Sequence, residues 1–132
     1  MIAGAHYDSI SLDDPKNAPG ADDNASGVAA LLETARVLAG CHPKQGIKLV
    51  FFSNEEVGTV GSMAYVASIK SSLPPAKVVG FIAVDTVAFG PAGEDLDLAT
   101  MPAQKPFADA VKTAVESFTS LKAKEVLSDL CG

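Results

Sequence analysis

Short apolar runs alternate along this chain with stretches of helical periodicity, and this alternation limits the fold more than any other feature does. The runs at residues 1–6, 47–53 and 77–85 have the length and composition of buried strands. Residues 24–38 place apolar side chains at helical spacing, and residues 58–69 form a second, shorter helical stretch. The pattern predicts an α/β fold in which a mostly parallel or mixed central sheet carries helices on both faces.

The other segments are loops, one more helix and one more strand. Asn24 or Ser26 can cap the start of the first helix, and Gly40 lies past its end. Proline and glycine mark the loops, and a proline suits the first turn of the last helix. The predicted segments are loops at residues 8–21, 71–76 and 87–101 (with an extended piece at 96–100), a helix at 106–118 and a strand at 121–127.

Composition bounds the class of protein. The 132 residues allow one domain, predicted to cover residues 1–132, and 48% hydrophobic with 20% charged residues excludes a disordered chain. The net charge of -6 makes nucleic acid an unexpected partner. No apolar run approaches the ~20 residues that span a bilayer, so no membrane partner is expected either. No signal peptide is visible, two cysteines are too few for a disulfide framework, and the compartment stays open.

Histidine and acidic residues gather at the predicted strand ends. Ligands of open α/β sheets bind beyond the carboxyl ends of the strands, so these side chains are expected to converge. Several carboxylates at one edge repel each other, and a divalent cation is the simplest compensation. The residues are His6 and Asp8 after the first strand, Asp22 and Asp23 before the first helix, Glu55 and Glu56 after the second strand, and Asp85 at the end of the third.

The expected metal follows from the types of ligand. An imidazole with carboxylates suits Zn²⁺, with Mn²⁺ or Co²⁺ as alternatives. Taken singly, each feature also has an ordinary explanation: a loop histidine, an aspartate pair that caps a helix, or a solvated glutamate pair. Asp85 is harder to explain in that way, because a charge at the end of an apolar strand is costly without a partner.

Three motifs then resemble a known family. They are AHYDS at residues 5–9, PGADDNASG at residues 19–27, and NEEVG at residues 54–58, which is followed by GS and AYV. In this order and spacing they resemble the M28 family of zinc metallopeptidases. Asp85, in AVDTVAFG, resembles the aspartate at the end of a later strand of that family. The resemblance covers residues 1 to about 128 and implies a zinc-dependent exopeptidase fold.

The resemblance also implies the metal ligands. Asp22 would bridge two zinc ions, His6 and Asp85 would complete the first metal position, and Glu56 would bind the second metal. The family has a fifth ligand, a histidine in a Ser-Asp-His stretch, whereas this chain has only His6 and His42. His42 is predicted to lie in an ordinary surface loop. We therefore expect one complete zinc position and a second that is partly filled or empty. Without the fifth ligand, the peptidase activity is expected to be impaired unless another chain supplies that ligand.

The remaining roles implied by the resemblance are catalytic. Glu55 would be the general base that takes a proton from the attacking water and passes it to the leaving amine. Asp8 would accept a hydrogen bond from His6 and fix its tautomer. The Asp22–Asp23 peptide bond would be cis.

Both ends of the chain depart from the family pattern. Either Ser128-Asp129 belongs to the motif of the fifth ligand with Leu130 in place of histidine, or the chain stops short of that motif, which we favour. The Cys131 thiolate is a third, weaker candidate for the ligand. Met1 begins on the first strand, so the chain is expected to be cut at both ends. Exposed sheet edges then predict a homo-oligomer, which size-exclusion chromatography can test.

Three functions fit these residues. The leading hypothesis is an aminopeptidase that acts on peptide substrates, because the resemblance implies a family that mostly removes amino-terminal residues. The acidic residues at the site, which favour a free amine, add to this. The second is a glutaminyl cyclase-like transferase that uses one zinc ion. The third is a non-catalytic interaction domain that keeps the fold without the metal.

Overall fold

The computed structural model describes residues 1–72, 77–91 and 95–127. Its contacts group into two compact units, Met1–Ala88 and Phe89–Gly132, and each unit is described by itself. The prediction of a single domain over the whole chain stays a prediction. The elements of the first unit are β1 (Ile2–His6), α1 (Ala25–Leu38), β2 (Lys48–Phe52), α2 (Val60–Ile69) and β3 (Phe81–Ala83).

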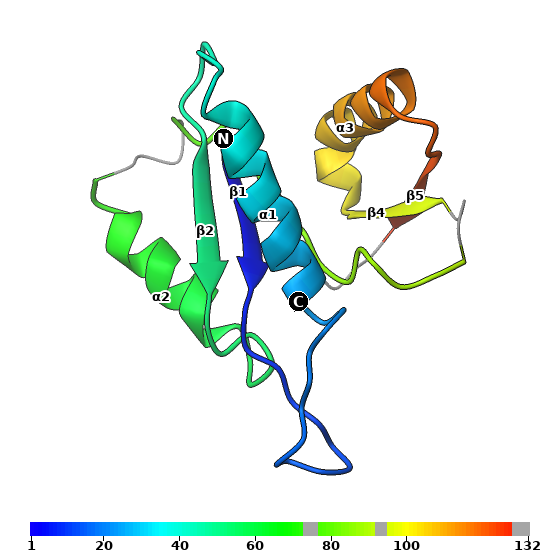
Figure 1. Cartoon of the computed structure of the whole chain (residues 1–132). Helices are drawn as coiled ribbons and strands as arrows, with labels where there is room; N and C mark the ends of the chain where they lie inside the picture. The colour runs from blue at the N-terminus through cyan, green and yellow to red at the C-terminus, as the bar shows by residue number, and fades with distance from the viewer. Residues whose placement is uncertain (73–76, 92–94, 128–132) are drawn as a thin grey trace. The chain divides into compact units, whose positions relative to one another are not determined.

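The first unit is built on a parallel sheet of three strands in the order β2-β1-β3. The central strand β1 pairs with β2 over its whole length, so that Ile2 lies opposite Lys48 and His6 opposite Phe52. All five residues of β1 are buried. Because the strands are parallel, their carboxyl ends meet at one edge, and α1 begins near that same edge (Figure 1).

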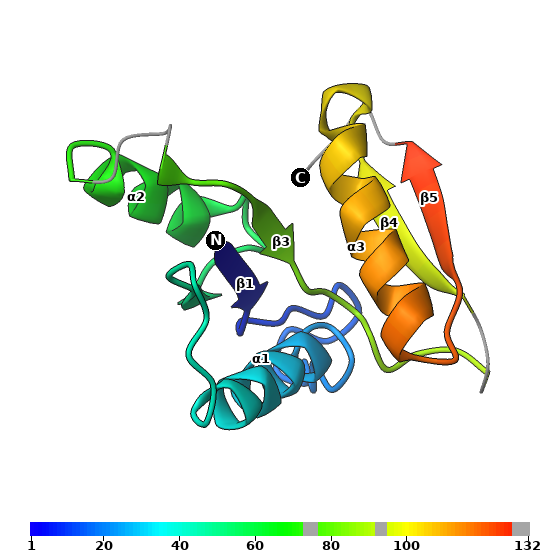
Figure 2. The ribbon, with the colours of Figure 1, turned by 90° about the horizontal axis from the view of Figure 1, so that it is seen from above.

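The two faces of this sheet are covered by different helices (Figure 2). On one face, Leu31 of α1 packs with the small residues Ala3 and Ala5 of β1, and this cluster is the hydrophobic core. On the other face, the ring of Phe52 lies over Gly4, where a Cβ atom would overlap it. Tyr65 of α2 meets the same ring edge-on, with 5.8 Å between the ring centroids. Small residues in β1 thus let side chains approach the central strand from both faces.

The second unit combines a parallel pair of strands with one helix. Its elements are β4 (Leu96–Thr100), the 3₁₀ turn η2 (Pro102–Gln104), α3 (Lys105–Phe118) and β5 (Ala123–Leu127). Strand β4 pairs with β5 in parallel, and α3 connects them. Ala108 of α3 and Ala123 of β5 are buried, and the Lys105 ammonium bonds both Asp109 and Glu125. This unit carries none of the predicted site residues among its described parts.

The predicted fold class is confirmed: the chain is α/β, and its paired strands are parallel. The predicted central sheet corresponds to two small sheets in the described residues, and the third strand is shorter than predicted, since only Phe81–Ala83 pair with β1. The second helix begins at Val60, because Gly58 and Thr59 before it have positive φ angles. In the described parts of the chain, no helix has the length and apolar character needed to cross a membrane.

Candidate metal centre

Four segments bring the candidate side chains to the carboxyl edge of the β2-β1-β3 sheet. His6 is the last residue of β1, and Glu55 and Glu56 follow β2 after one short turn. Asp85 follows β3, and Asp23 lies just before the start of α1. The convergence expected from the strand ends is therefore present, because the parallel strands all finish at this edge.

The imidazole of His6 is the centre of the group. It is 5% exposed, and its Nε2 atom lies 3.1 Å from Asp23 Oδ1, 3.5 Å from Asp85 Oδ1 and 3.9 Å from Glu55 Oε2. Despite these short distances Nε2 is buried without a hydrogen-bond partner of acceptable geometry. A buried nitrogen that faces several acidic oxygens calls for a cation or a proton.

The other ring nitrogen suggests which tautomer is present. His6 Nδ1 lies 3.1 Å from the backbone carbonyl oxygen of Asp8, an acceptor only. A proton on Nδ1 satisfies that carbonyl and leaves a lone pair on Nε2. In the neutral ring this lone pair faces the carboxylate oxygens, which is the electronic arrangement of a metal-ligating histidine.

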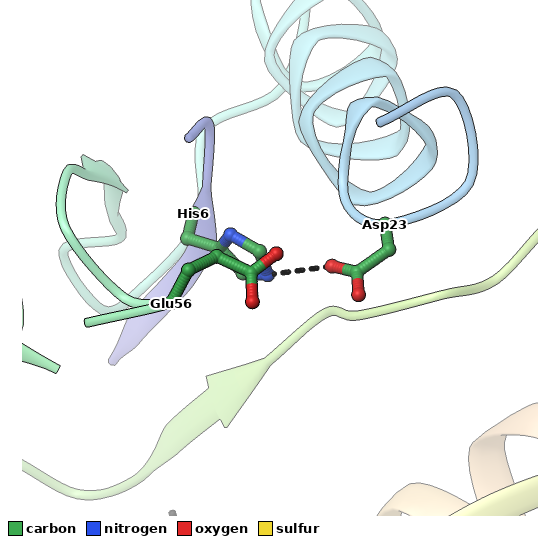
Figure 3. A group of neighbouring side chains, drawn as sticks. All are labelled: His6, Asp23 and Glu56. Carbon is green, nitrogen blue, oxygen red and sulfur yellow. Dashed lines mark ion pairs between the residues drawn. The ribbon is translucent and has the colours of Figure 1, made fainter. Parts of the chain in front are cut away.

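Three side chains come close enough to share one cation. One ligand atom each from His6, Asp23 and Glu56 lie within 4.8 Å of one another. Figure 3 shows the carboxylates of Asp23 and Glu56 turned toward the His6 ring. An imidazole with two carboxylates matches the donors that Zn²⁺ takes in proteins.

Electrostatics within the group reflect this concentration of acids. Burial by itself lowers the pKa of His6, but the Asp85 carboxylate, the Asp8 carbonyl and the other nearby acids outweigh it and raise the pKa above its usual value. Burial and the carboxylate of Asp23 raise the pKa of Glu56. The surroundings thus favour positive charge at the centre of the group.

Asp8 holds the loop that carries the two glutamates. Its carboxylate accepts the backbone N–H of Glu55 at 3.1 Å and that of Glu56 at 3.2 Å. Burial alone would raise the pKa of Asp8, but these two N–H groups lower it below its usual value. The hydrogen bond expected between Asp8 and His6 involves the backbone carbonyl of Asp8, since its carboxylate lies farther from Nδ1, at 3.6 Å.

Of the two adjacent aspartates, the one that approaches His6 is Asp23 rather than the expected Asp22. The Asp22 carboxylate instead accepts the backbone N–H of Ala88 at 2.8 Å. The cis peptide bond is likewise one position later than expected, between Asp23 and Asn24. Asn24 caps α1 by accepting the N–H of Gly27, so Asp23 lies immediately outside the helix, next to the strand ends.

The placement of Asp23 could not be read from the residue types. The N-cap of the helix offers one signal, because a cap at Asn24 places Asp23 next to the helix start. The sequence allows Ser26 equally well as the cap, so this signal does not decide between the two aspartates. His42 is exposed, as predicted. Ser128, Asp129 and Cys131, considered for the fifth ligand, lie outside the described residues.

Comparison with known proteins identifies the family. The model of peptidase family M28 matches residues 1–131. The chain belongs to peptidase family M28. The resemblance of the three motifs is thereby confirmed. No solved structure matches the chain.

Several curated relatives of this M28 chain have descriptive names. A "Probable leucine aminopeptidase" of Arthroderma benhamiae is 30% identical over 142 residues, which cover 100% of this chain and 36% of that protein. Aminopeptidase YwaD of Bacillus subtilis is 44% identical over 62 residues, 47% of this chain and 12% of that protein. A "Probable zinc metalloprotease" of Pyrenophora tritici-repentis is 40% identical over 74 residues, 54% of this chain and 17% of that protein. The M28 chain thus spans 12% to 36% of the length of these relatives.

Proposed function

We propose that this chain carries the metal site of a zinc-dependent exopeptidase that removes amino-terminal residues from peptides. The observation that carries the proposal is the buried His6 Nε2 atom, which lacks a hydrogen-bond partner and faces acidic oxygens. An unpaired buried polar atom is costly, and a cation between the ring and the carboxylates removes that cost. Membership of a peptidase family supports the choice of reaction.

The proposed metal ligands are His6, Asp23, Glu56 and Asp85. Asp23 takes the role that the sequence suggested for Asp22, because its carboxylate lies 3.1 Å from His6 Nε2. His6, Asp23 and Asp85 would hold the first ion, and Glu56 with Asp23 would provide for a second. A zinc ion held there supplies Lewis-acid chemistry, since it lowers the pKa of water and polarises a peptide carbonyl.

Glu55 is the proposed general base. Its Oε2 atom lies 3.9 Å from His6 Nε2, so the carboxylate borders the ligand group, and the side chain is 37% exposed and open to substrate. Asp8 fixes the backbone at Glu55 and acts as a positioning residue. A carboxylate held in this way can accept a proton from the attacking water and deliver it to the leaving amine.

The acidic surroundings favour a substrate with a free amino terminus. A substrate ammonium group would be attracted by the carboxylates that the metal leaves uncompensated. The aminopeptidase names of the relatives support the same choice. Self-association of the chain remains part of the proposal, with a homo-oligomer as the expected state.

The test is zinc titration by calorimetry together with peptide hydrolysis by the full chain. We expect zinc binding by the wild-type chain, loss of binding in His6→Ala, and binding without turnover in Glu55→Gln, because a general base contributes about 10²–10⁴-fold. Hydrolysis is expected for a peptide with a free amino terminus and not for its acetylated form. Zinc binding that His6→Ala leaves unchanged would contradict the proposal, and cyclisation of a glutaminyl peptide would favour the transferase.

A further inference from the structure

Side chains on either side of Asp23 bind the segment that carries Asp85. The bonds join residues 22–26, at the start of α1, to residues 84–88, which follow β3. Pairing of β3 with β1 ends with the bond from the Val84 N–H to the Gly4 carbonyl. Beyond that point, these side chains replace a strand partner for the backbone around Asp85.

Asn24 binds the peptide groups on both sides of Asp85. Its Nδ2 donates to the Val84 carbonyl at 2.9 Å, and its Oδ1 accepts the Thr86 N–H at 3.3 Å. The same Oδ1 caps α1 through the Gly27 N–H. Asn24 is 1% exposed, so this amide is shielded from competing water. One buried side chain therefore connects the helix start to the backbone of Asp85.

Asp22 and Ser26 extend the connection by two residues. Ser26 Oγ accepts the Val87 N–H at 3.1 Å and donates to the Asp22 carbonyl at 2.7 Å. Asp22 Oδ1 accepts the Ala88 N–H at 2.8 Å. Three successive backbone N–H groups, at residues 86, 87 and 88, are thus each received by a side chain from residues 22–26. We call Asp22, Asn24 and Ser26 the acceptor clamp.

We propose that the acceptor clamp fixes the distance between the Asp23 and Asp85 carboxylates, and that Asp22 acts in it as a positioning residue and not as a metal ligand. The inference rests on the proposed function, because it concerns the same metal site. Asp23 lies between two members of the clamp and Asp85 between two residues that the clamp binds. Both carboxylates therefore move with the clamp, and a metal site tolerates little such movement.

The clamp and the ligand roles predict different responses to the same chemical change. Asparagine keeps an oxygen that accepts the Ala88 N–H but removes the charge, so Asp22→Asn should keep zinc affinity within about threefold of wild type. Asp22→Ala removes the acceptor and should weaken zinc binding about 10–100-fold, as changes beside metal ligands do. Asp23→Asn removes a ligand and should weaken binding more than Asp22→Ala does.

The experiment titrates zinc alone, by calorimetry, into the full wild-type chain and these three variants. Asp13→Asn is the matched control, because Asp13 is an exposed aspartate of the preceding loop and its change removes the same charge. Cobalt absorption spectra of wild type and of the three variants at Asp22 and Asp23 report whether the geometry of metal coordination changes. Rescue of Asp22→Ala by asparagine is the expected result. An Asp22→Asn variant as weak as Asp23→Asn, or an Asp22→Ala variant as tight as wild type, would overturn the proposal.

Amide hydrogen exchange tests the clamp without metal. In Asp22→Ala, the Ala88 amide should exchange faster than in wild type, and in Asp22→Asn it should stay protected. Equal exchange in all three chains would refute the clamp even where zinc binds. A wild-type chain that binds no zinc while the Ala88 amide behaves as expected would refute the proposed function and the positioning role, and leave the hydrogen bonds in place.

Discussion

Replacing Gly27 by alanine tests how closely α1 approaches the strand end that carries Asp85. Gly27 lies in the first turn of α1 and is buried. A Cβ atom there would overlap the carbonyl oxygen of Val84 and the side-chain oxygen of Asn24. One of these is backbone and the other a buried amide, so neither can move aside without breaking a bond of the clamp.

Opposing effects determine the expected size of the change. Overpacking costs about 1–3 kcal/mol, and loss of one Asn24 hydrogen bond adds about 1 kcal/mol. Alanine gains about 1 kcal/mol over glycine in a helix interior. The overlap therefore outweighs the helix preference, and Gly27→Ala should lower the free energy of unfolding by about 1–3 kcal/mol.

The control is Gly40→Ala, at a glycine after α1 whose added Cβ would meet nothing within 4 Å. It should be neutral or stabilising by up to about 1 kcal/mol, because it restricts the unfolded chain. Urea unfolding followed by circular dichroism measures both variants. If Gly27→Ala is as stable as Gly40→Ala, the close approach of α1 to Val84 is refuted, and with it the physical basis of the clamp.

Three further predictions concern pH. Asp8→Asn should destabilise the chain by about 1–3 kcal/mol at neutral pH, because it turns an amide donor toward backbone donors. The lowered pKa of Asp8 means that its contribution to stability is fully present above the unfolded pKa near 3.8 and is lost as pH falls through the folded value. The stabilities of wild type and variant in urea unfolding should therefore converge as the pH is lowered below 3.8, and a constant difference would contradict this. Zinc affinity should fall as pH drops below the raised pKa of His6, by about tenfold per pH unit, because one proton competes with the metal. The folding stability of the metal-free chain should depend on pH in the opposite direction. The charged form of His6 stabilises this chain fully below its unfolded pKa near 6.5, and the stabilisation is lost as pH rises through the folded value. Calorimetry at several pH values measures the zinc affinity, and urea unfolding at several pH values measures the stability of the metal-free chain. A zinc affinity or a stability that does not change with pH would contradict the corresponding prediction.

The sequence predicts the edge of the sheet at which His6, Glu55 and Asp85 meet, because strand ends follow directly from apolar runs and parallel pairing. It does not predict which of two neighbouring aspartates faces the histidine. Asp22 and Asp23 have the same side chain, and the backbone between a loop and a helix cap decides which way each points. That backbone depends on hydrogen bonds to residues 84–88, sixty or more positions away, and the local spacing of apolar residues carries no information about such distant bonds.

Helices and strands within short segments can be predicted because their spacing is visible in the sequence, whereas the acceptor clamp joins distant segments and cannot be predicted in this way. The helix ending at Leu38 and the buried strand ending at His6 follow from spacing and apolar composition. The third strand was predicted as nine residues, from the apolar run at 77–85, but pairing with a single neighbour extends only over Phe81–Ala83. An apolar run marks where a strand can form, and the partner strand decides how much of it does.

The long sequence separation within the clamp has a consequence for biosynthesis. Asn24 meets its partners 60 and 62 residues later in the chain, and closing so long a loop is slow compared with forming a helix. A nascent chain whose synthesis has passed His6 and Asp23 still lacks the backbone that orders them until residues 84–88 have left the ribosome. Binding of a metal ion would then come late in folding, because a half-made polypeptide offers only unordered acids and the two imidazoles of His6 and His42.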